Sequence, residues 1–235
     1  MYAVISPEKI EIPAGSIFQM PGTWSEYETL SKQLGDCEAS RRHRSIPRLK
    51  YRRGEIWFMS PLPEHARNAS LVADTIKAIL DHIGKEYEAF TPITMRLPQR
   101  SGIEPDYCFY IDNWQAAAGK KRIDWTSEPA PDLVIEVDIT SYTNVNDYLA
   151  YKVPEVWLFK SDEVWSWGSP PGTTSSRSDR LTIYRLQNDS YVESDRSGYF
   201  PELEILQLIS ECFIDAENRN TSAAIRQLRQ KLNES

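Results

Sequence analysis

Two carboxylates lie two residues apart in a stretch with the pattern of a buried β-strand, PDLVIEVDIT at residues 131–140. From residue 133 onward the odd positions are apolar, whereas Glu136 and Asp138 occupy even positions. Because side chains alternate between the two faces of a strand, these carboxylates point to the same face. Like charges at that spacing repel, and burying them costs free energy. The pair therefore indicates either a site that uses both charges or a solvated strand face, on which such alternation is routine.

Two further carboxylates open another strand-like stretch, EPDYCFY at residues 104–110. Pro105 has no backbone N–H, so it is confined to the beginning or the edge of a strand, and the acids lie where the strand begins. An aspartate after a proline is also typical of a simple turn cap. Alternation predicts that one face of this strand carries Glu104, Asp106, Cys108 and Tyr110.

Pairing of these two strands would bring Asp106 near Glu136 and Asp138. Clustered carboxylates are costly unless a cation joins them, and Mg²⁺ binds one or two carboxylates together with waters and substrate phosphate. A metal ion there would polarise a phosphoryl oxygen and lower the pKa of a bound water, as phosphodiester hydrolysis requires. The three acids therefore predict a phosphodiester-cleaving metal site.

Composition limits the class of protein. The chain has 235 residues, enough for one large domain or two small ones, and its net charge of -7 argues against non-specific coating of nucleic acid. No apolar stretch approaches the roughly 18 residues of a membrane span, so we expect a cytoplasmic protein. The three cysteines are dispersed, which disfavours structural zinc and a disulfide framework. The two glycine-rich motifs that bind nucleotide phosphates, G-x-x-x-x-G-K and G-x-G-x-x-G, are both absent from the sequence.

Hydrophobic periodicity places the elements. Helices are predicted at residues 23–35, where Thr23 and Glu26 have the spacing of a capping box, and at 64–84. Strands are predicted at 89–98 and 102–111. Residues 47–61, with a turn at Arg53-Gly54, and residues 181–194, with a turn at Asn188-Asp189, are each typical of a hairpin. Residues 131–160 predict a strand, a short helix and a parallel strand. A Ser-, Gly- and Pro-rich stretch at 162–180 reads as a loop. We expect an N-terminal extension over 1–45 with its helix packed on the core, a core over 46–215 and a C-terminal helix over 216–235.

An ordered set of short motifs resembles a known family. The motifs are IPAG, TWSEYETL, PRLKYRRGEIWFMSPLPEH, GIEPDYCFYI, PDLVIEVDITS, VPEVW and LTIYRL, and they span nearly the whole chain. The chain resembles the Uma-two family of restriction-endonuclease-like proteins, within the PD-(D/E)xK nuclease superfamily. The resemblance implies an α/β fold, with a restriction-endonuclease-like mixed β-sheet flanked by helices.

The resemblance also implies roles for the acids. Asp106 matches the first acid of the superfamily and Glu136 matches the acid of its (D/E)xK element, with Mg²⁺ or Mn²⁺ as the cofactor. Asp138 stands where the superfamily has a lysine that orients or deprotonates the attacking water, and aspartate cannot supply that positive charge. Two possibilities stay open. Lys152 or Lys160 takes over that role, or Asp138 binds a second cation instead.

The predicted catalytic and metal-binding residues are thus Asp106, Glu136 and Asp138. A second tier comprises His65, which opens a helix and could face the carboxylates, together with Glu104 and Lys152. The predicted function is a divalent-metal-dependent endonuclease that acts on DNA, as a homodimer by analogy with the superfamily. The alternative is a catalytically inactive binding or regulatory module, which the acidic balance and the missing lysine favour; the retained acids favour the nuclease.

Overall fold

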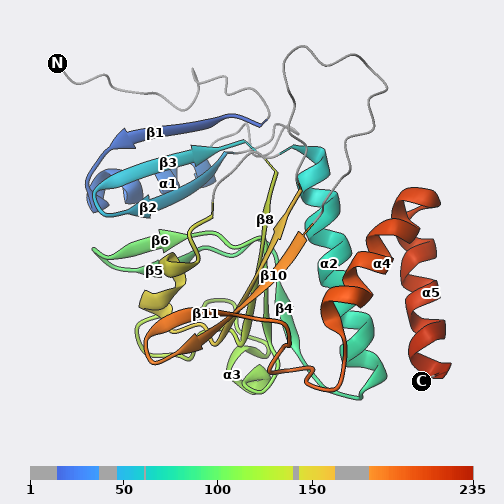
Figure 1. Ribbon diagram of the computed structural model, residues 1–235. Helices are drawn as coiled ribbons and strands as arrows, with labels where there is room; N and C mark the ends of the chain where they lie inside the picture. The colour runs from blue at the N-terminus through green and yellow to red at the C-terminus, as the bar shows by residue number, and fades with distance from the viewer. Residues whose placement is uncertain (1–14, 37–46, 61, 140–142, 162–179, 235) are drawn as a thin grey trace, which may run out of the picture. The chain divides into compact units, whose positions relative to one another are not determined.

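The computed structural model describes residues 15–36, 47–60, 62–139, 143–161 and 180–234 (Figure 1). It divides into two compact units. The first unit comprises Met1–Pro63 and Thr94–Glu104, and the second comprises Glu64–Ile93 and Pro105–Ser235. The domain boundaries predicted at residues 45 and 215 stay a prediction, and most of the predicted loop at 162–180 lies outside the described residues.

The first unit is an antiparallel sheet with one helix. The sheet has five strands in the order β1-β3-β2-β6-β5. Its elements are β1 (Ile17–Pro21), α1 (Trp24–Asp36), β2 (Arg48–Arg52), β3 (Glu55–Met59), β5 (Met95–Leu97) and β6 (Ser101–Ile103). The predicted hairpin is β2 and β3, which turn through Arg53 and Gly54 with positive φ angles of 50° and 82°.

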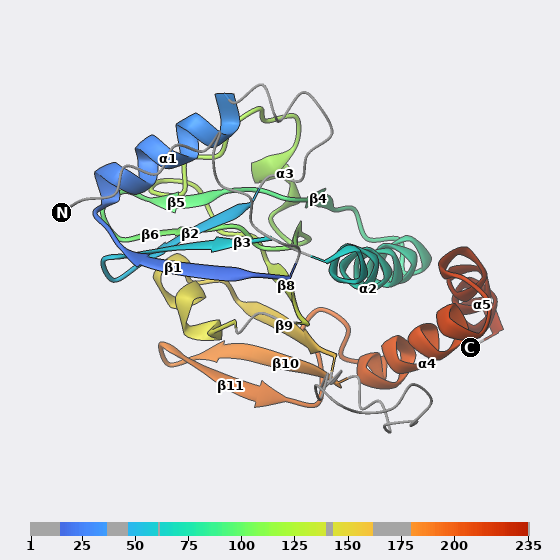
Figure 2. The ribbon, with the colours of Figure 1, turned by 90° about the horizontal axis from the view of Figure 1, so that it is seen from above.

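Helix α1 begins with the capping box that the sequence predicts. The backbone N–H of Thr23 donates to Glu26 Oε2 at 2.7 Å, and the N–H of Glu26 donates to Thr23 Oγ1 at 3.3 Å. One face of α1 packs on the sheet, as Figure 2 shows, and Tyr27 is fully buried there. A Cβ at residue 102 would overlap the Tyr27 ring, so Gly102 permits this close approach.

The second unit is a mixed sheet with helices packed on it, as predicted. Its six strands follow the order β11-β10-β9-β8-β7-β4, in which β8 and β9 are parallel and the other neighbours antiparallel. Its elements are α2 (Pro63–His82), β4 (Glu88–Phe90), β7 (Tyr107–Tyr110), α3 (Trp114–Ala117), β8 (Leu133–Asp138), η3 (Val145–Tyr151), β9 (Glu155–Lys160), β10 (Arg180–Gln187), β11 (Ser190–Ser194), α4 (Ile205–Asn218) and α5 (Thr221–Glu234).

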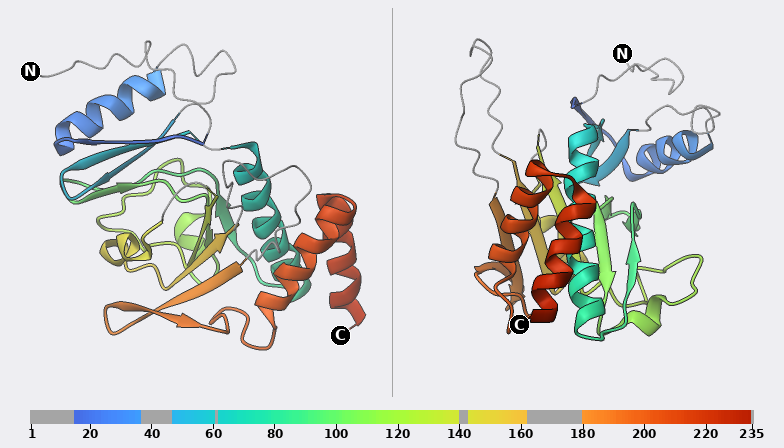
Figure 3. Two further views of the ribbon diagram at one scale, coloured as in Figure 1. Left: turned by 45° about the horizontal axis from the view of Figure 1, so that its top comes forward. Right: turned by 90° about the vertical axis from the view of Figure 1, so that its right-hand side faces the viewer.

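One face of the six-stranded sheet forms the main core against α2, α4 and α5 (Figures 1 and 3). The odd positions of β8 and β9 point into this core: Leu133, Ile135, Val137, Trp157 and Phe159. The even positions of β8 therefore point to the opposite face, as the alternation predicts. The crossover from β8 to β9 is parallel, as predicted, and its helix is the 3-10 helix η3.

Two predicted strands are wrong in their extent. The stretch 89–98 divides into β4 and β5, and the stretch 102–111 divides into β6 and β7. Each break contains a proline, Pro92 or Pro105, which has no N–H to donate to a sheet ladder. The halves of each stretch join different sheets, so Glu104 does not share a strand face with Asp106. Helices α3 and α4 were not predicted.

Candidate active site

The pairing of β7 with β8 determines where Asp106 lies. The two strands are antiparallel, with Tyr107 opposite Ile135. The start of β7 therefore lies at the carboxyl end of β8, and continuing the register by one residue sets Asp106 opposite Glu136. Directly opposed residues of an antiparallel pair share a face of the sheet. Long-range pairing thus brings together the two acids that the sequence predicts as metal ligands.

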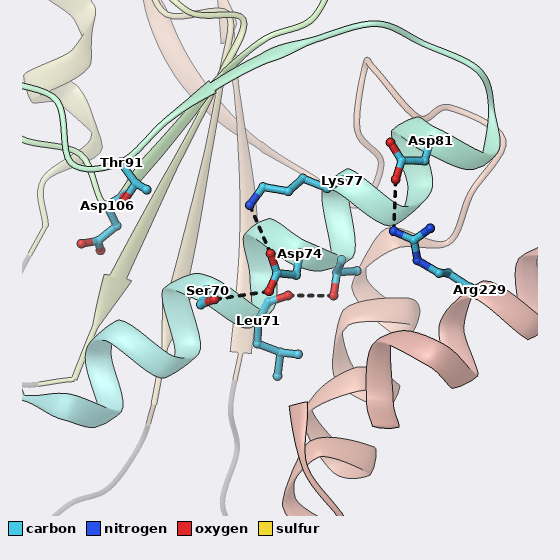
Figure 4. A network of polar contacts seen from close by, with 9 residues as sticks. Ser70, Leu71, Asp74, Lys77, Asp81, Thr91, Asp106 and Arg229 are labelled. Carbon is cyan, nitrogen blue, oxygen red and sulfur yellow. Dashed lines mark hydrogen bonds and ion pairs between the residues drawn. The ribbon is translucent and has the colours of Figure 1, made fainter. Parts of the chain in front are cut away.

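Asp106 is almost completely buried and is held from several sides. The residue as a whole is only 1% exposed. His65 Nε2, from the first turn of α2, donates to Asp106 Oδ1 at 2.7 Å, and the backbone N–H of Val137 donates to Oδ2 at 2.8 Å. Thr91 Oγ1 donates to the backbone carbonyl of Asp106 at 2.7 Å (Figure 4). A buried carboxylate needs such donors, and these define its orientation.

His65 itself is 4% exposed. It lies one residue after Glu64 at the start of α2, where an acid complements the helix dipole. The sequence left His65 as a second-tier residue that could face the carboxylates, and its Nε2 lies 2.7 Å from Asp106 Oδ1. An imidazole bonded to a carboxylate is a common way of orienting a metal-binding group from outside the coordination sphere.

Glu136 lies on the sheet face away from the main core and is partly exposed. The hydroxyl of Tyr148, from η3, donates to Glu136 Oε1. Burial raises the pKa of Tyr148 well above its ordinary value, and the negative charges of Glu136 and Asp106 raise it further. Tyr148 therefore stays protonated and remains a hydrogen-bond donor. The charges of Asp106 and Glu136 thus both contribute to the raised pKa of Tyr148.

Asp138 is 5% exposed and is engaged by Thr143. The backbone N–H of Thr143 donates to Asp138 Oδ2 and the Thr143 hydroxyl donates to Oδ1, both at 2.7 Å. On the neighbouring strand, Lys160 is level with Asp138 in the parallel register, so these two side chains share a face. The strand position that lacks the expected lysine thus has a lysine beside it on β9.

The donor set fits a hard cation with few protein ligands. No group of three or more His, Cys, Asp or Glu side chains is arranged to hold a metal ion among the residues that the structure describes. Mg²⁺ commonly uses one or two carboxylates, with waters and substrate oxygens completing its octahedron. Asp106 and Glu136 would supply these two carboxylates.

The other two second-tier residues, Glu104 and Lys152, directly follow β6 and η3. Glu104 belongs to the first unit, where Thr94 Oγ1 donates to it at 3.0 Å. Burial raises the pKa of Glu104, while the Thr94 hydrogen bond and the Arg48 charge oppose that shift. Lys152 is exposed and ends η3 in the left-handed conformation with φ 55°. It precedes β9, at the opposite end of the β8–β9 pair from Asp138.

Sequence reasoning missed the partners of the acids. Tyr148 and Thr143 carry no motif that singles them out, since one is an ordinary apolar position of a short helix and the other belongs to a polar turn. An aspartate five residues before a threonine is also too common to predict their bond. Their roles follow from tertiary packing.

Comparison with known proteins supplies a family. The sequence profile of the Uma2 family, described as "Putative restriction endonuclease", matches residues 24–215, which is most of the chain. The chain belongs to the Uma2 family. This confirms the resemblance to the Uma-two family and its restriction-endonuclease-like fold.

A solved structure from Anabaena variabilis, described as "a putative nuclease belonging to DUF820", is similar to this Uma2 chain at 17% identity. The alignment covers 81% of this chain and 98% of that one, with a TM-score of 0.47. A search of curated proteins finds no match. Across the described residues of this Uma2 member, no helix has the length and apolar character that a membrane crossing requires.

Proposed function

We propose that this Uma2 protein is a divalent-metal-dependent nuclease that hydrolyses phosphodiester bonds of DNA. Membership of a family described as "Putative restriction endonuclease" supports a nuclease-like role, and restriction-endonuclease-like proteins generally use divalent metal ions. One observation supports the proposal for this chain: β7 pairs with β8, and the Asp106 carboxylate accepts from the backbone N–H of Val137, the residue that follows Glu136.

The residues have separate tasks in this proposal. Asp106 and Glu136 hold Mg²⁺ or Mn²⁺, and Asp138 is the third predicted acid. When bound, the ion supplies Lewis-acid polarisation of the phosphoryl oxygen and a lower pKa for a bound water. His65 and the Val137 N–H orient the Asp106 carboxylate, and the low exposure of Asp106 excludes competing water from it.

Lys160 is the better placed of the two lysines that the sequence leaves open. Its position level with Asp138 supports a cation at the site, where a positive charge would attract the substrate phosphate and orient a water. Lys152 is exposed and lies at the other end of β9. We therefore propose Lys160 as the source of positive charge on this sheet face.

Titration with Mn²⁺ tests the metal site directly. We expect the full-length protein to bind Mn²⁺ in isothermal titration, and Asp106→Asn and Glu136→Gln to abolish that binding. Asp112→Asn is the matched control, since the Asp112 side chain is 64% exposed and pairs with Lys85. The same variants should then be compared for Mg²⁺-dependent cleavage of plasmid DNA. Equal Mn²⁺ affinity in the wild type and in Asp106→Asn would refute the proposed site.

A second candidate is a binding or regulatory module with a nuclease fold and no catalysis. It is favoured by Asp138 at the usual lysine position, where Thr143 engages both of its carboxylate oxygens. Asp138→Lys tests this, because it restores the superfamily residue beside Glu136. Gain of cleavage in Asp138→Lys supports a nuclease scaffold that lost its lysine. A folded variant that stays inert with Mg²⁺ and Mn²⁺, alongside an inert wild type, supports the module instead.

Assembly and location stay predictions. A two-fold dimer follows by analogy with paired subunits that cut both strands of a duplex, and a cytoplasmic location follows from composition. Light scattering at micromolar concentration tests the first, and a monomer would refute it.

A further inference from the structure

We infer that Asp138 is a positioning residue, which acts through Thr143 and Tyr148 to hold the carboxylate of Glu136. We call Asp138, Thr143 and Tyr148 the η3 anchor. This inference rests on the proposed function and deepens it, because it assigns different work to the two acids that share the face of β8. Glu136 is the metal-binding group, and Asp138 holds the segment that orients it.

The first contact of the η3 anchor joins Asp138 to a single residue by two hydrogen bonds. Both carboxylate oxygens accept from Thr143, one from its backbone N–H and one from its hydroxyl, at 2.7 Å each. Hydrogen bonds to an ionised carboxylate are stronger than neutral ones, and two bonds to one residue restrict its rotation. Asp138 therefore determines where the chain lies as it enters η3.

The anchored residue leads directly into η3. Asn144 follows Thr143 and is the N-cap of η3, where its side chain accepts from the N–H of Asn146 at 3.0 Å. A 3-10 helix of seven residues has poor hydrogen-bond geometry and little stability of its own. Its position therefore depends on what holds its ends, and the Asp138–Thr143 contact holds the first.

The last contact returns to β8. Tyr148 is 1% exposed, so its ring cannot reorient freely, and its hydroxyl donates to Glu136. Asp138 at the end of β8 thus binds Thr143, just before η3. Tyr148 of η3 in turn binds Glu136, which lies two residues before Asp138 on the same face of β8. A partner that orients a metal-binding carboxylate typically changes metal affinity by 10–100-fold when removed.

Replacements at Thr143 separate positioning from metal binding. If Asp138 is a positioning residue, Thr143→Val, Tyr148→Phe and Asp138→Ala should each weaken Mn²⁺ binding by roughly 10-fold. Thr143→Ser keeps the hydroxyl and should restore affinity. If Asp138 is instead a ligand, Asp138→Ala should lose far more Mn²⁺ affinity than Thr143→Val does, because it removes a metal-binding group and not only a partner of one.

Asp138→Asn gives a second, independent reading. The amide oxygen of asparagine can accept from the Thr143 N–H, and its NH₂ can donate to the Thr143 hydroxyl, so the contact survives without the charge. Positioning therefore predicts that Asp138→Asn binds Mn²⁺ far better than Asp138→Ala. Equal losses in these two variants would overturn the inference. Circular dichroism on each variant confirms that the comparison is made between folded proteins.

A metal-free measurement keeps this inference distinct from the proposed function. Thermal unfolding in EDTA should be measured for Asp138→Ala, Tyr148→Phe and the double variant. Because releasing either end frees the same segment, the loss of Tm in the double variant should be smaller than the sum of the single losses. Additive losses would refute the η3 anchor. A wild type that binds no Mn²⁺ refutes the proposed function, while this cycle still decides the anchor.

Discussion

Both ends of the parallel pair β8 and β9 carry buried carboxylates, and the two ends differ in what those carboxylates contact. At the amino end, Asp132 is 2% exposed and accepts from the backbone N–H groups of Ile111 and Asn113 at 2.7 and 3.1 Å. Glu155 is 1% exposed and accepts from Trp157 Nε1 at 2.6 Å and from the backbone N–H of Gly198 at 2.8 Å.

At the carboxyl end, one of the carboxylates, Glu136, is partly exposed. His65 donates to Asp106, and Tyr148 donates to Glu136. The donors around Asp132 are backbone N–H groups together with Asn113 Nδ2 and the Tyr199 hydroxyl. They join loops to strands and leave a buried carboxylate little freedom for other work. Side-chain donors around a partly exposed carboxylate orient it and keep it within reach of a ligand. We therefore propose that the amino end serves stability and that the carboxyl end serves the function proposed above.

The largest expected effect is at Asp132. Asp132→Ala leaves the N–H groups of Ile111 and Asn113 without their acceptor, and we expect a loss of about 3 kcal/mol in the free energy of unfolding. Urea denaturation measures it, with the exposed Asp112→Ala as the control. Folded Asp132→Ala should keep its Mn²⁺ affinity. A small loss of stability together with lost Mn²⁺ binding would reverse the assignment of the two ends.

Mn²⁺ should raise the stability of the wild type by nearly as much. An ion that binds only the native state contributes about 2.7 kcal/mol at 100 times its Kd. Thermal unfolding with and without Mn²⁺ should show this increase in the wild type and not in Asp106→Asn. An undiminished increase in Asp106→Asn would mean that the ion binds away from the carboxyl end.

Removal of the His65 contact should have an intermediate effect. His65→Ala deprives Asp106 of a donor at 2.7 Å, and we expect Mn²⁺ binding to weaken by about 1.5–2 kcal/mol. Isothermal titration measures the change, and His82→Ala, at the exposed end of α2, is the control. If His65→Ala binds Mn²⁺ like the wild type, then His65 only fills space beside the sheet.

The smallest effect should come from an exposed carboxylate, which sets the baseline for both ends. Asp81 pairs with Arg229 at 3.1 Å, and the two side chains are 47% and 53% exposed (Figure 4). We expect Arg229→Ala to cost about 0.5 kcal/mol at low salt and less at high salt. Urea denaturation at two salt concentrations measures it. A loss as large as that of Asp132→Ala would show that burial is not what separates these carboxylates.

Local structure could be predicted from the sequence because short-range geometry determines it. The capping box of Thr23 and Glu26 predicts the start of α1, and the turn through Asn188 and Asp189 predicts the β10–β11 hairpin. Alternation along residues 133–138 predicts a buried face and a face that carries acids. Each of these depends on contacts within a few residues, where the spacing of side chains is set by the backbone repeat.

The partners of the acids were decided by tertiary structure. Asp106 accepts from the Val137 N–H because β7 pairs with β8, and no local pattern specifies which strands become neighbours. The same holds for Tyr148, which reaches Glu136 from a helix twelve residues away, and for the backbone donors that engage Asp132. The sequence by itself determined that two acids share a strand face. What surrounds each acid depends on long-range packing, which brings distant donors to a buried charge.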